Sequence, residues 1–208
     1  MGPTRLLFCV SPSIRRLRRS VTVGHWKGNA MFIRSDRLML RPIFPEDWRE
    51  LFAGLSDESV VRMLASAPWP YTAEDAHAFC DRPRGADEML FAITLPGDDG
   101  APLIGTIGLA PAGPGPAYEL GYWIARNRQR QGYGSEAVGA VLRTARALGI
   151  HEARAGHFLD NPASGKVLQR WGFLPEDRLE ATVSAGRGGE SVPARRYHLS
   201  LAKVTDLY

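Results

Sequence analysis

The stretch Gln129-Arg130-Gln131-Gly132-Tyr133-Gly134 lies between a strand-like run over residues 118–124 and a helix-like run over residues 135–148. A glycine-rich turn that opens a helix can direct unpaired backbone N–H groups, and the positive end of the helix dipole, toward a diphosphate. Its two glycines also remove side chains where a backbone must approach phosphate closely. The turn is therefore a candidate anchor for a diphosphate-bearing coenzyme.

The elements that follow the turn have clear boundaries in the sequence. An apolar stripe at helical spacing predicts a helix that ends before Gly149. A strand is predicted over residues 152–158, and a second helix begins at an N-cap, Asn161, followed by Pro162. Gly172 marks the end of that helix. Two further strands are predicted near residues 173–184 and 195–202, around a polar hairpin at residues 186–190.

The elements that precede the turn form a different pattern. A strand is predicted at residues 38–42, followed by two short amphipathic helices near residues 46–55 and 58–64. Thr72 and Asp75 have the spacing of a capping box, which predicts a third helix to about Cys80. Three strands then follow, separated by Gly/Asp-rich and Pro/Gly-rich turns, at residues 89–95, 103–109 and 118–124. Such tight turns favour an antiparallel meander.

Composition limits the class of protein. The chain has 208 residues, of which 44% are apolar and 23% charged, which is typical of one globular domain with a sizeable core. Its two cysteines, Cys9 and Cys80, cannot form a disulfide framework, and neither they nor the histidines have metal-ligand spacing. We therefore expect a cytoplasmic protein without a metal site.

Basic residues are concentrated in residues 1–30, which hold six Lys and Arg and no acidic residue. Without those six, 20 Lys and Arg stand against 22 Asp and Glu, so residues 31–208 carry a formal charge of −2. We expect residues 1–30 to be a disordered, solvated extension and residues 31–208 to be the folded domain. Binding of the extension to nucleic acid or anionic lipid is a less favoured alternative. Its apolar run, residues 6–10, is too short to span a membrane.

Several ordered motifs together resemble one known family. The order of strand, Gln-x-x-Gly-x-Gly turn, helix and strand, followed by Asn161-x-x-Ser164-x-Lys166-Val167-x-x-x-x-Gly172-Phe173, resembles the acyl-coenzyme A binding core of the GNAT N-acetyltransferases. The motifs Arg37-Leu-x-Leu-Arg41-Pro42 and Pro70-Tyr71-Thr72 are most similar to the branch that includes the ribosomal-protein N-terminal (Rim-type) acetyltransferases. The resemblance covers about residues 32–203.

The resemblance implies a mixed α/β (α+β) fold. Its central sheet is mostly antiparallel and twisted, has about seven strands, is flanked by helices and is splayed between the fourth and fifth strands. The co-substrate implied is acetyl-CoA, with no metal. Backbone amides of the turn would bind the diphosphate, and the splayed strand would bind the pantetheine arm. The implied coenzyme-binding residues are Tyr122, Trp123, Ile124, Gln129, Arg130, Gln131, Gly132, Tyr133, Gly134, Ser135, Asn161 and Ser164.

Acyl transfer to an amine also requires proton transfer. An alkylammonium with a pKa near 10.4 must lose a proton before its nitrogen can attack, and Glu119 is the candidate base, with a purely structural carboxylate as the alternative. Ser164 is placed by the resemblance near the sulphur of the coenzyme, as an acid or only as a hydrogen-bond partner. A tyrosine that the family often has on this helix is replaced by Leu168. Trp69 and Tyr71, with Glu119, are expected to bind the acceptor.

The sequence therefore predicts an acetyl-CoA-dependent N-acetyltransferase, monomeric or homodimeric and without a membrane or nucleic-acid partner. It would transfer acetyl directly, in a ternary complex, to the primary amine of a protein N-terminus or a small molecule. The alternative from another class is a non-catalytic acyl-CoA-binding or regulatory protein. It would keep the glycine turn but lack a working acid and base.

Overall fold

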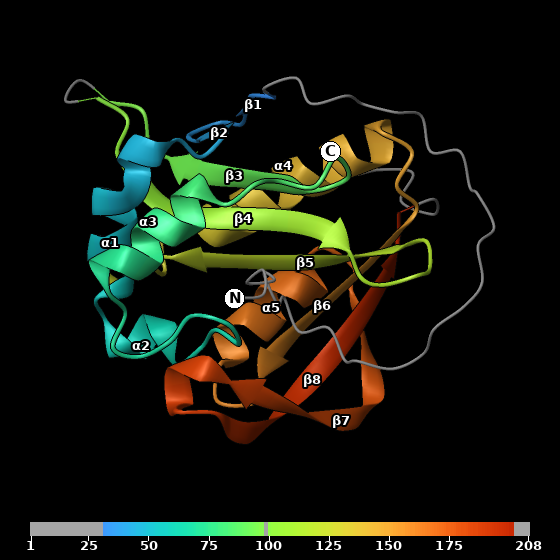
Figure 1. Cartoon of the computed structure of the whole chain (residues 1–208). Coiled ribbons are helices and arrows are strands. Elements are labelled where there is room, and N and C mark those ends of the chain that lie inside the picture. The colour runs from blue at the N-terminus through green and yellow to red at the C-terminus, as the bar shows by residue number, and fades with distance from the viewer. Residues whose placement is uncertain (1–30, 98–99, 202–208) are drawn as a thin grey trace.

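The computed structural model describes residues 31–97 and 100–201, and the basic segment 1–30 lies outside it. Among these residues a single sheet has eight strands in the order β1-β2-β3-β4-β5-β6-β8-β7 (Figure 1). The strands are β1 (Ile33–Arg34), β2 (Met39–Arg41), β3 (Met89–Thr94), β4 (Leu103–Pro111), β5 (Ala117–Ile124), β6 (Glu152–Phe158), β7 (Leu174–Ser184) and β8 (Glu190–Ser200). The helices are η1 (Pro45–Asp47), α1 (Trp48–Leu55), α2 (Glu58–Val61), α3 (Ala73–Asp81), η2 (Arg126–Arg128), α4 (Tyr133–Ala147), α5 (Pro162–Arg170) and η3 (Ala185–Arg187).

The strand pairing confirms a mixed, mostly antiparallel sheet. Strands β1 to β5 pair antiparallel in chain order, β5 pairs parallel with β6, and β8 pairs antiparallel with both β6 and β7. The strand beyond the seven expected is β1, whose two residues are too few for an alternating pattern to predict. The tight turns predicted between β3, β4 and β5 therefore produce the expected meander.

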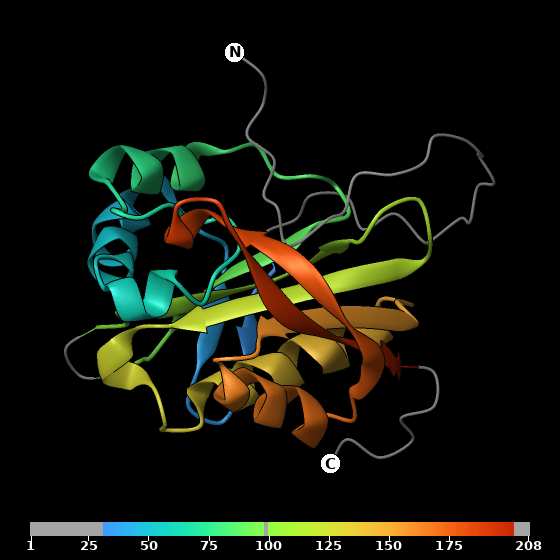
Figure 2. The ribbon, with the colours of Figure 1, turned by 90° about the horizontal axis from the view of Figure 1, so that it is seen from below.

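Two helical layers cover opposite faces of the sheet (Figure 2). Helices α4 and α5 pack on one face, where Val138, Val141 and Leu168 join the main hydrophobic core. Helices α1 to α3 lie on the other face over a second apolar cluster, which includes Trp123 of β5. Alternate residues of β5 thus face different layers, as their period of two predicts.

The predicted helix boundaries follow from local hydrogen bonds. Thr72 and Asp75 form the expected capping box of α3. The Thr72 hydroxyl accepts a hydrogen bond from the Asp75 backbone N–H at 3.1 Å, and the Asp75 carboxylate accepts one from the Thr72 backbone N–H at 2.9 Å. The side chain of Asn161 accepts the Ser164 amide at 3.3 Å at the start of α5. Gly149 follows α4 with a φ of 79°, a left-handed conformation that favours glycine. These predictions are confirmed.

The chain departs from the predicted elements where tertiary contacts decide the structure. Helix α2 ends at Val61, not near residue 64, and the next residues hydrogen-bond to the β7–β8 connection. Strand β8 begins at Glu190, five residues before its predicted start, because its first residues pair with the end of β7. No local pattern encodes either contact.

The central feature of the fold is the separation of β5 from β6. These strands pair only from Ala117 to Leu120 on β5 and from Glu152 to Ala155 on β6. Beyond those pairs, the last four residues of β5 stay paired with β4 but have no partner on β6. The predicted splay is therefore present, and it opens at the end of β5 that leads into the glycine turn.

Candidate active site

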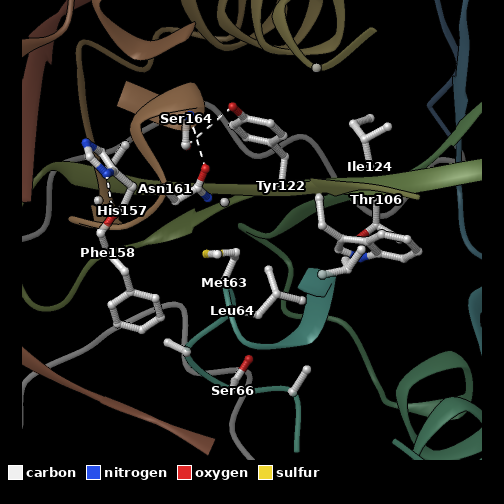
Figure 3. Close-up of a pocket in the computed structure, with 18 of the residues that line it drawn as sticks. Met63, Leu64, Ser66, Thr106, Tyr122, Ile124, His157, Phe158, Asn161 and Ser164 are labelled. Atoms are coloured by element: carbon white, nitrogen blue, oxygen red, sulfur yellow. Dashed lines mark hydrogen bonds between the residues drawn. The ribbon is translucent and has the colours of Figure 1, made fainter. Parts of the chain in front are cut away.

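A cleft of about 960 Å³ runs through the gap between β5 and β6 and reaches both faces of the sheet (Figure 3). On one face it is lined by the first turn of α4 and by α5, and on the other by the segment from α2 to α3. Glu119 and the last four residues of β5 lie along it between these two parts. We call the part beside α4 and α5 the coenzyme side, and the part beside α2 and α3 the acceptor side.

The turn at the start of α4 has the conformation of an anion-binding loop. Arg130 and Gly132 both adopt left-handed backbone, with φ angles of 60° and 85°, and Gly132 is the N-cap of α4. Such alternation turns successive N–H groups toward one concave side. Gly134 packs against the Tyr122 ring, where an added Cβ would lie 2.9 Å from a ring carbon. Gly132 therefore provides the left-handed backbone of the turn, and Gly134 provides space for the Tyr122 ring.

Arg37 holds this turn from outside. Its guanidinium donates to the Gln131 carbonyl at 3.0 Å and to the Glu136 carboxylate at 2.7 Å, and it lies 4.5 Å from the centre of the Tyr133 ring. Burial opposes ionisation of Glu136, but hydrogen bonds from Arg37 and from the Ser35 hydroxyl outweigh it and lower the pKa of Glu136. The ion pair compensates a carboxylate that would otherwise repel a phosphate at the helix N-terminus.

The two glutamines of the turn make bonds within the protein. The side-chain amide of Gln129 donates to the Ile124 carbonyl at 2.9 Å, which ties the turn to the end of β5. The side-chain amide of Gln131 donates to the backbone carbonyl of Asn127 at 3.2 Å. Gln131 is not among the residues that line the cleft. Gly132, Tyr133, Gly134 and Ser135 do line it, as does Arg130.

On the coenzyme side, three polar side chains meet where β5 and α5 face each other (Figure 3). The Tyr122 hydroxyl lies 3.4 Å from the Ser164 hydroxyl, and the Asn161 side chain accepts the Ser164 amide. Burial raises the pKa of Tyr122, although its bond to Ser164 opposes the shift. Asn161 acts as the predicted N-cap, and it lines the cleft together with Tyr122 and Ser164.

Glu119 lines the cleft between its two sides and is only 4% exposed, and its carboxylate accepts a hydrogen bond from the Arg196 guanidinium at 2.6 Å. The Arg196 side chain extends from β8 over Gly156 to reach the Glu119 carboxylate. A Cβ atom at position 156 would lie 2.8 Å from the guanidinium, so glycine leaves the space that the arginine occupies. Burial raises the pKa of Glu119, while Arg196 and Arg154 lower it without cancelling the effect. Glu119 is thus a desolvated carboxylate with an arginine partner.

The two predicted aromatic acceptor residues are placed differently. Tyr71 lines the cleft, is 8% exposed and packs in the apolar cluster under α1 to α3. Trp69 is 38% exposed and lies outside the cleft lining. The lining of the cleft also includes the apolar side chains of Leu55, Val60, Met63, Leu64, Phe79, Trp123 and Phe158.

The tip of the β7–β8 hairpin lies beside α2 (Figure 2), and hydrogen bonds hold the two together. The Arg187 guanidinium binds both carboxylate oxygens of Asp160 at 2.9 Å and donates to the Arg62 carbonyl, also at 2.9 Å. The Ser184 hydroxyl donates to the Leu64 carbonyl at 3.1 Å. These bonds join three segments that are far apart in the sequence.

Sequence patterns did not predict Arg196, Arg187 or the supporting role of Arg37. Arg37 belongs to a motif that indicates the family and carries no information about the contacts of its side chain. Arg196 and Arg187 carry no local signal, because each acts on a carboxylate that is 27 or more residues away in the chain. Gly156, which makes room for Arg196 inside a strand, was the available hint.

Residues 31–97 and 100–201 contain no helix long and apolar enough to cross a membrane. The same part of the chain has no group of three His, Cys, Asp or Glu side chains that could hold a metal ion.

A glycine turn at a helix N-terminus, beside a separated pair of strands, is an arrangement typical of coenzyme A-dependent acyltransferases. The chain belongs to the GNAT acetyltransferase family, whose domain model matches residues 37–174, and it is an acetyltransferase. Members of this family bind acetyl-CoA and act on amine acceptors.

Among similar proteins, the uncharacterised N-acetyltransferase YoaA of Bacillus subtilis is 31% identical over 151 residues, 71% of this chain and 85% of YoaA. A GNAT-family acetyltransferase structure from Bacillus anthracis has a TM-score of 0.69 at 24% identity and covers 83% of this chain and 100% of its own. RimL, an α-N-protein acetyltransferase of ribosomal L7/L12 solved with coenzyme A, has a TM-score of 0.64 at 18% identity, covering 82% and 98%. The two structural matches support the fold alone.

Proposed function

We propose that the protein transfers acetyl from acetyl-CoA directly to a primary amine, with both substrates held together in the cleft. The continuity of the cleft from the start of α4, through the gap between the strands, to Glu119 is the observation that carries this proposal. The reaction needs no covalent enzyme intermediate. Cys80 is buried outside the cleft lining, and burial raises the pKa of its thiol to about 11.

The residues of the coenzyme side suit acetyl-CoA. Backbone amides of residues 130–134 would bind the diphosphate, where the left-handed Arg130 and Gly132 shape the turn. The free edge of β5 at Tyr122, Trp123 and Ile124 would bind the pantetheine amides as an added strand does. When bound, acetyl-CoA supplies an activated acetyl thioester. An amide of this β5 segment can stabilise the oxyanion.

Glu119 and Ser164 are the proposed proton-transfer residues. Glu119 would take a proton from the attacking nitrogen, directly or through water, since it lies where the cleft passes between the strands. Ser164 would donate a hydrogen bond or a proton to the departing sulphur. Its hydroxyl is near the phenol of Tyr122, a better acid than serine, which can resupply a proton. Leu168 cannot serve as that acid, because its side chain has no ionisable group, and it packs in the core.

The ribosomal-protein branch is part of this proposal. Both arginines of the motif Arg37-Leu-x-Leu-Arg41-Pro42 make specific contacts. Arg37 donates to the carbonyl of Gln131 in the glycine turn, and Arg41 forms two hydrogen bonds of 2.7 Å with the Asp47 carboxylate. On the basis of this motif, and not of the structural match, we propose for this chain the class of acceptor that RimL uses, a protein α-amino group. A small-molecule amine remains the other candidate.

Thiol release from acetyl-CoA in the presence of amines tests the function, with coenzyme affinity measured separately by calorimetry. We expect Glu119→Gln to lower kcat by about 100-fold with little change in coenzyme affinity. Burial raises the pKa of Glu119, so wild-type kcat/KM should fall as the pH drops through that raised value, and the substitution should remove this inflection. Glu152→Gln, an exposed change on β6, is the control. An unchanged pH profile in Glu119→Gln would eliminate Glu119 as the base.

The non-catalytic alternative makes a different prediction. A protein that binds acetyl-CoA by calorimetry but releases no thiol with a broad set of amines and peptides would support a binding or regulatory role. Thiol release that depends on both an amine and Glu119 would exclude it.

A further inference from the structure

Three polar side-chain groups on the acceptor side make no hydrogen bond to any part of the chain that the structure describes. They are the hydroxyls of Tyr71 and Thr106 and the indole N–H of Trp123. All three residues line the cleft and are 8%, 5% and 8% exposed, respectively. Among the described residues, the fully enclosed side-chain nitrogens without a partner belong to Arg82 and Arg84, so the three groups are open to the cleft. Because buried polar groups are nearly always hydrogen-bonded, these groups are suited to bind a molecule that enters it.

Thr106 and Trp123 are neighbours on the sheet. They pair across β4 and β5, so their side chains project from the same face. Thr106 lies on the same side of β5 as Leu64, opposite Tyr122 (Figure 3). The Trp123 ring packs against α1, where a Cβ at position 54 would lie 2.7 Å from two ring carbons. Gly54 therefore leaves the space for the ring, and this packing sets the direction of the indole N–H.

A strip of the sheet without side chains connects this pair with Glu119. Glu119, Gly121 and Trp123 project from one face of β5, because side chains alternate along a strand. Gly121 lines the cleft and pairs with Gly108 of β4, so neither strand places a side chain between the carboxylate and the indole. Two residues of a strand span about 7 Å, which puts Gly121 midway between them. An acceptor with its nitrogen near Glu119 can therefore extend along the sheet to Thr106.

Tyr71 adds a second hydroxyl in the apolar cluster that contains Trp123. Burial and the charge of Asp75 raise the pKa of Tyr71, so its phenol is neutral at physiological pH. All three polar groups are thus uncharged, and the charge that acts on Tyr71 is negative. A carboxylate bound among them would lose its hydration without gaining a cation, whereas an uncharged group avoids that cost.

The donors and acceptors of the three groups narrow the ligand further. The indole N–H of Trp123 can only donate, while the hydroxyls of Thr106 and Tyr71 can donate or accept. The bound group must therefore present a lone pair to the indole, which an ammonium does not have. A hydroxyl and an amide both supply an uncharged oxygen of this kind.

We propose that Tyr71, Thr106 and Trp123 form a polar subsite that binds an uncharged oxygen of the acceptor, on a hydroxyl or an amide group, away from the reacting nitrogen. This inference rests on the proposed function and concerns which amines the protein uses. An acceptor that has an alkyl chain in place of this oxygen would leave the three groups without partners, so the subsite selects against it.

Matched pairs of amines test the subsite. The alcohols 4-amino-1-butanol, 6-amino-1-hexanol and 8-amino-1-octanol differ from pentylamine, heptylamine and nonylamine only by a hydroxyl in place of a methyl group. We expect kcat/KM to be at least tenfold higher for the alcohol in at least one pair. A wholly apolar wall would favour the alkylamine, because the hydroxyl would lose its hydration there. Equal values within every pair, or higher values for the alkylamines, would overturn the proposal.

An amide and a carboxylate of the same shape test the requirement for an uncharged oxygen. We expect kcat/KM to be at least tenfold higher for 6-aminohexanamide than for 6-aminohexanoate. An equal or higher value for the carboxylate would contradict this requirement. Comparison of 6-aminohexanamide with 6-amino-1-hexanol distinguishes the source of the oxygen. A faster amide indicates a peptide-like acceptor and a faster alcohol indicates a hydroxylated amine; either supports the subsite.

Substitutions that remove a single oxygen test the assignment to these residues. In Thr106→Val and in Tyr71→Phe, the ratio of kcat/KM between alcohol and alkylamine should fall at least threefold, with acetyl-CoA affinity within about twofold of wild type. Thr106→Ser keeps the hydroxyl and should keep the ratio. An unchanged ratio in both folded variants, Thr106→Val and Tyr71→Phe, would refute the assignment.

Thr94→Val is the matched control for Thr106→Val. Thr94 is a buried threonine of β3 outside the cleft lining, and its hydroxyl donates to the Met39 carbonyl at 2.8 Å. Its substitution should lower thermal stability but leave the ratio unchanged. An equal fall of the ratio in Thr94→Val and Thr106→Val would mean that the hydroxyl of Thr106 acts only through the stability of the sheet.

Failure of this inference differs from failure of the proposed function. Thiol release at equal rates with alcohols and alkylamines leaves acetyl transfer to an amine intact and removes only the subsite. Absence of thiol release with every amine tested, from protein that binds acetyl-CoA by calorimetry, would remove both.

Discussion

The two sides of the cleft are built in different ways. The coenzyme side consists mainly of backbone, in a turn whose shape depends on left-handed Arg130 and Gly132 and on a helix N-terminus. The acceptor side consists of side chains from separate segments, held by Arg196 and by Arg187. The first arrangement suits a coenzyme that is the same throughout the family, and the second leaves the acceptor open to variation.

This difference explains why the two sides should respond differently to mutation. A change in the turn alters the direction of several N–H donors at once, so the coenzyme should lose most of its binding energy there. A change on the acceptor side removes one side-chain contact among many apolar ones, so its effect should be smaller and confined to the acceptor.

The largest effect should follow from Gly132→Val. Gly132 has a φ of 85°, which a β-branched residue adopts only under strain, so the turn should rearrange and its amides should lose their common direction. We expect coenzyme affinity to fall about 100-fold, roughly 2.7 kcal/mol, as measured by calorimetry.

Gly149→Val is the matched control for that prediction. Gly149 ends the same helix with a φ of 79°, and nothing lies within 4 Å of an added Cβ. It should cost similar stability in thermal unfolding but leave coenzyme affinity within about twofold. Equal loss of coenzyme affinity in both variants would mean that Gly132 serves only the helix boundary.

The parts of the fold that depend on local contacts could be predicted from the sequence, and the parts that depend on contacts between distant segments could not. Thr72, Asn161 and Gly149 act on residues within a few positions, so the helix boundaries and the coenzyme turn could be predicted from local patterns. The splay was predicted through resemblance, because strand pairing depends on contacts across the sheet.

The contacts that build the acceptor side could not be predicted, for the same physical reason. Glu119 was singled out, but its partner Arg196 comes 77 positions later, and the contact between Arg187 and the Arg62 carbonyl spans 125 positions. Trp69 was chosen as an aromatic residue between prolines, and it lies outside the cleft lining. Such contacts form only when the sheet brings the strands together, so one sequence does not reveal them.

An intermediate effect should follow from Arg37→Ala, because Arg37 is a side chain that supports the backbone turn. Its loss frees the Gln131 carbonyl and leaves Glu136 uncompensated near the diphosphate site. We expect coenzyme affinity to fall about tenfold, or about 1.4 kcal/mol, with kcat at saturating coenzyme nearly unchanged.

A second substitution separates the two contributions of Arg37. In Arg37→Ala with Glu136→Gln, the repulsive carboxylate is absent, so affinity should recover to within about threefold of wild type if charge compensation dominates. No recovery would assign the effect to the Gln131 carbonyl and the shape of the turn. Arg34→Ala on β1 is the control for loss of a nearby surface charge.

The smallest effect should follow from Arg187→Ala on the acceptor side. Arg187 bridges Asp160 and the Arg62 carbonyl at the hairpin tip, and Asp160 is partly exposed, so each contact should contribute modestly. We expect the acceptor KM to rise about fivefold while coenzyme affinity stays within twofold. Arg178→Ala, an exposed change on β7, should alter neither value. A parallel loss of coenzyme affinity in Arg187→Ala would show that the two sides are coupled through β6. Asp160 follows the end of β6, and Gly156 of the same strand pairs with Arg196 of β8.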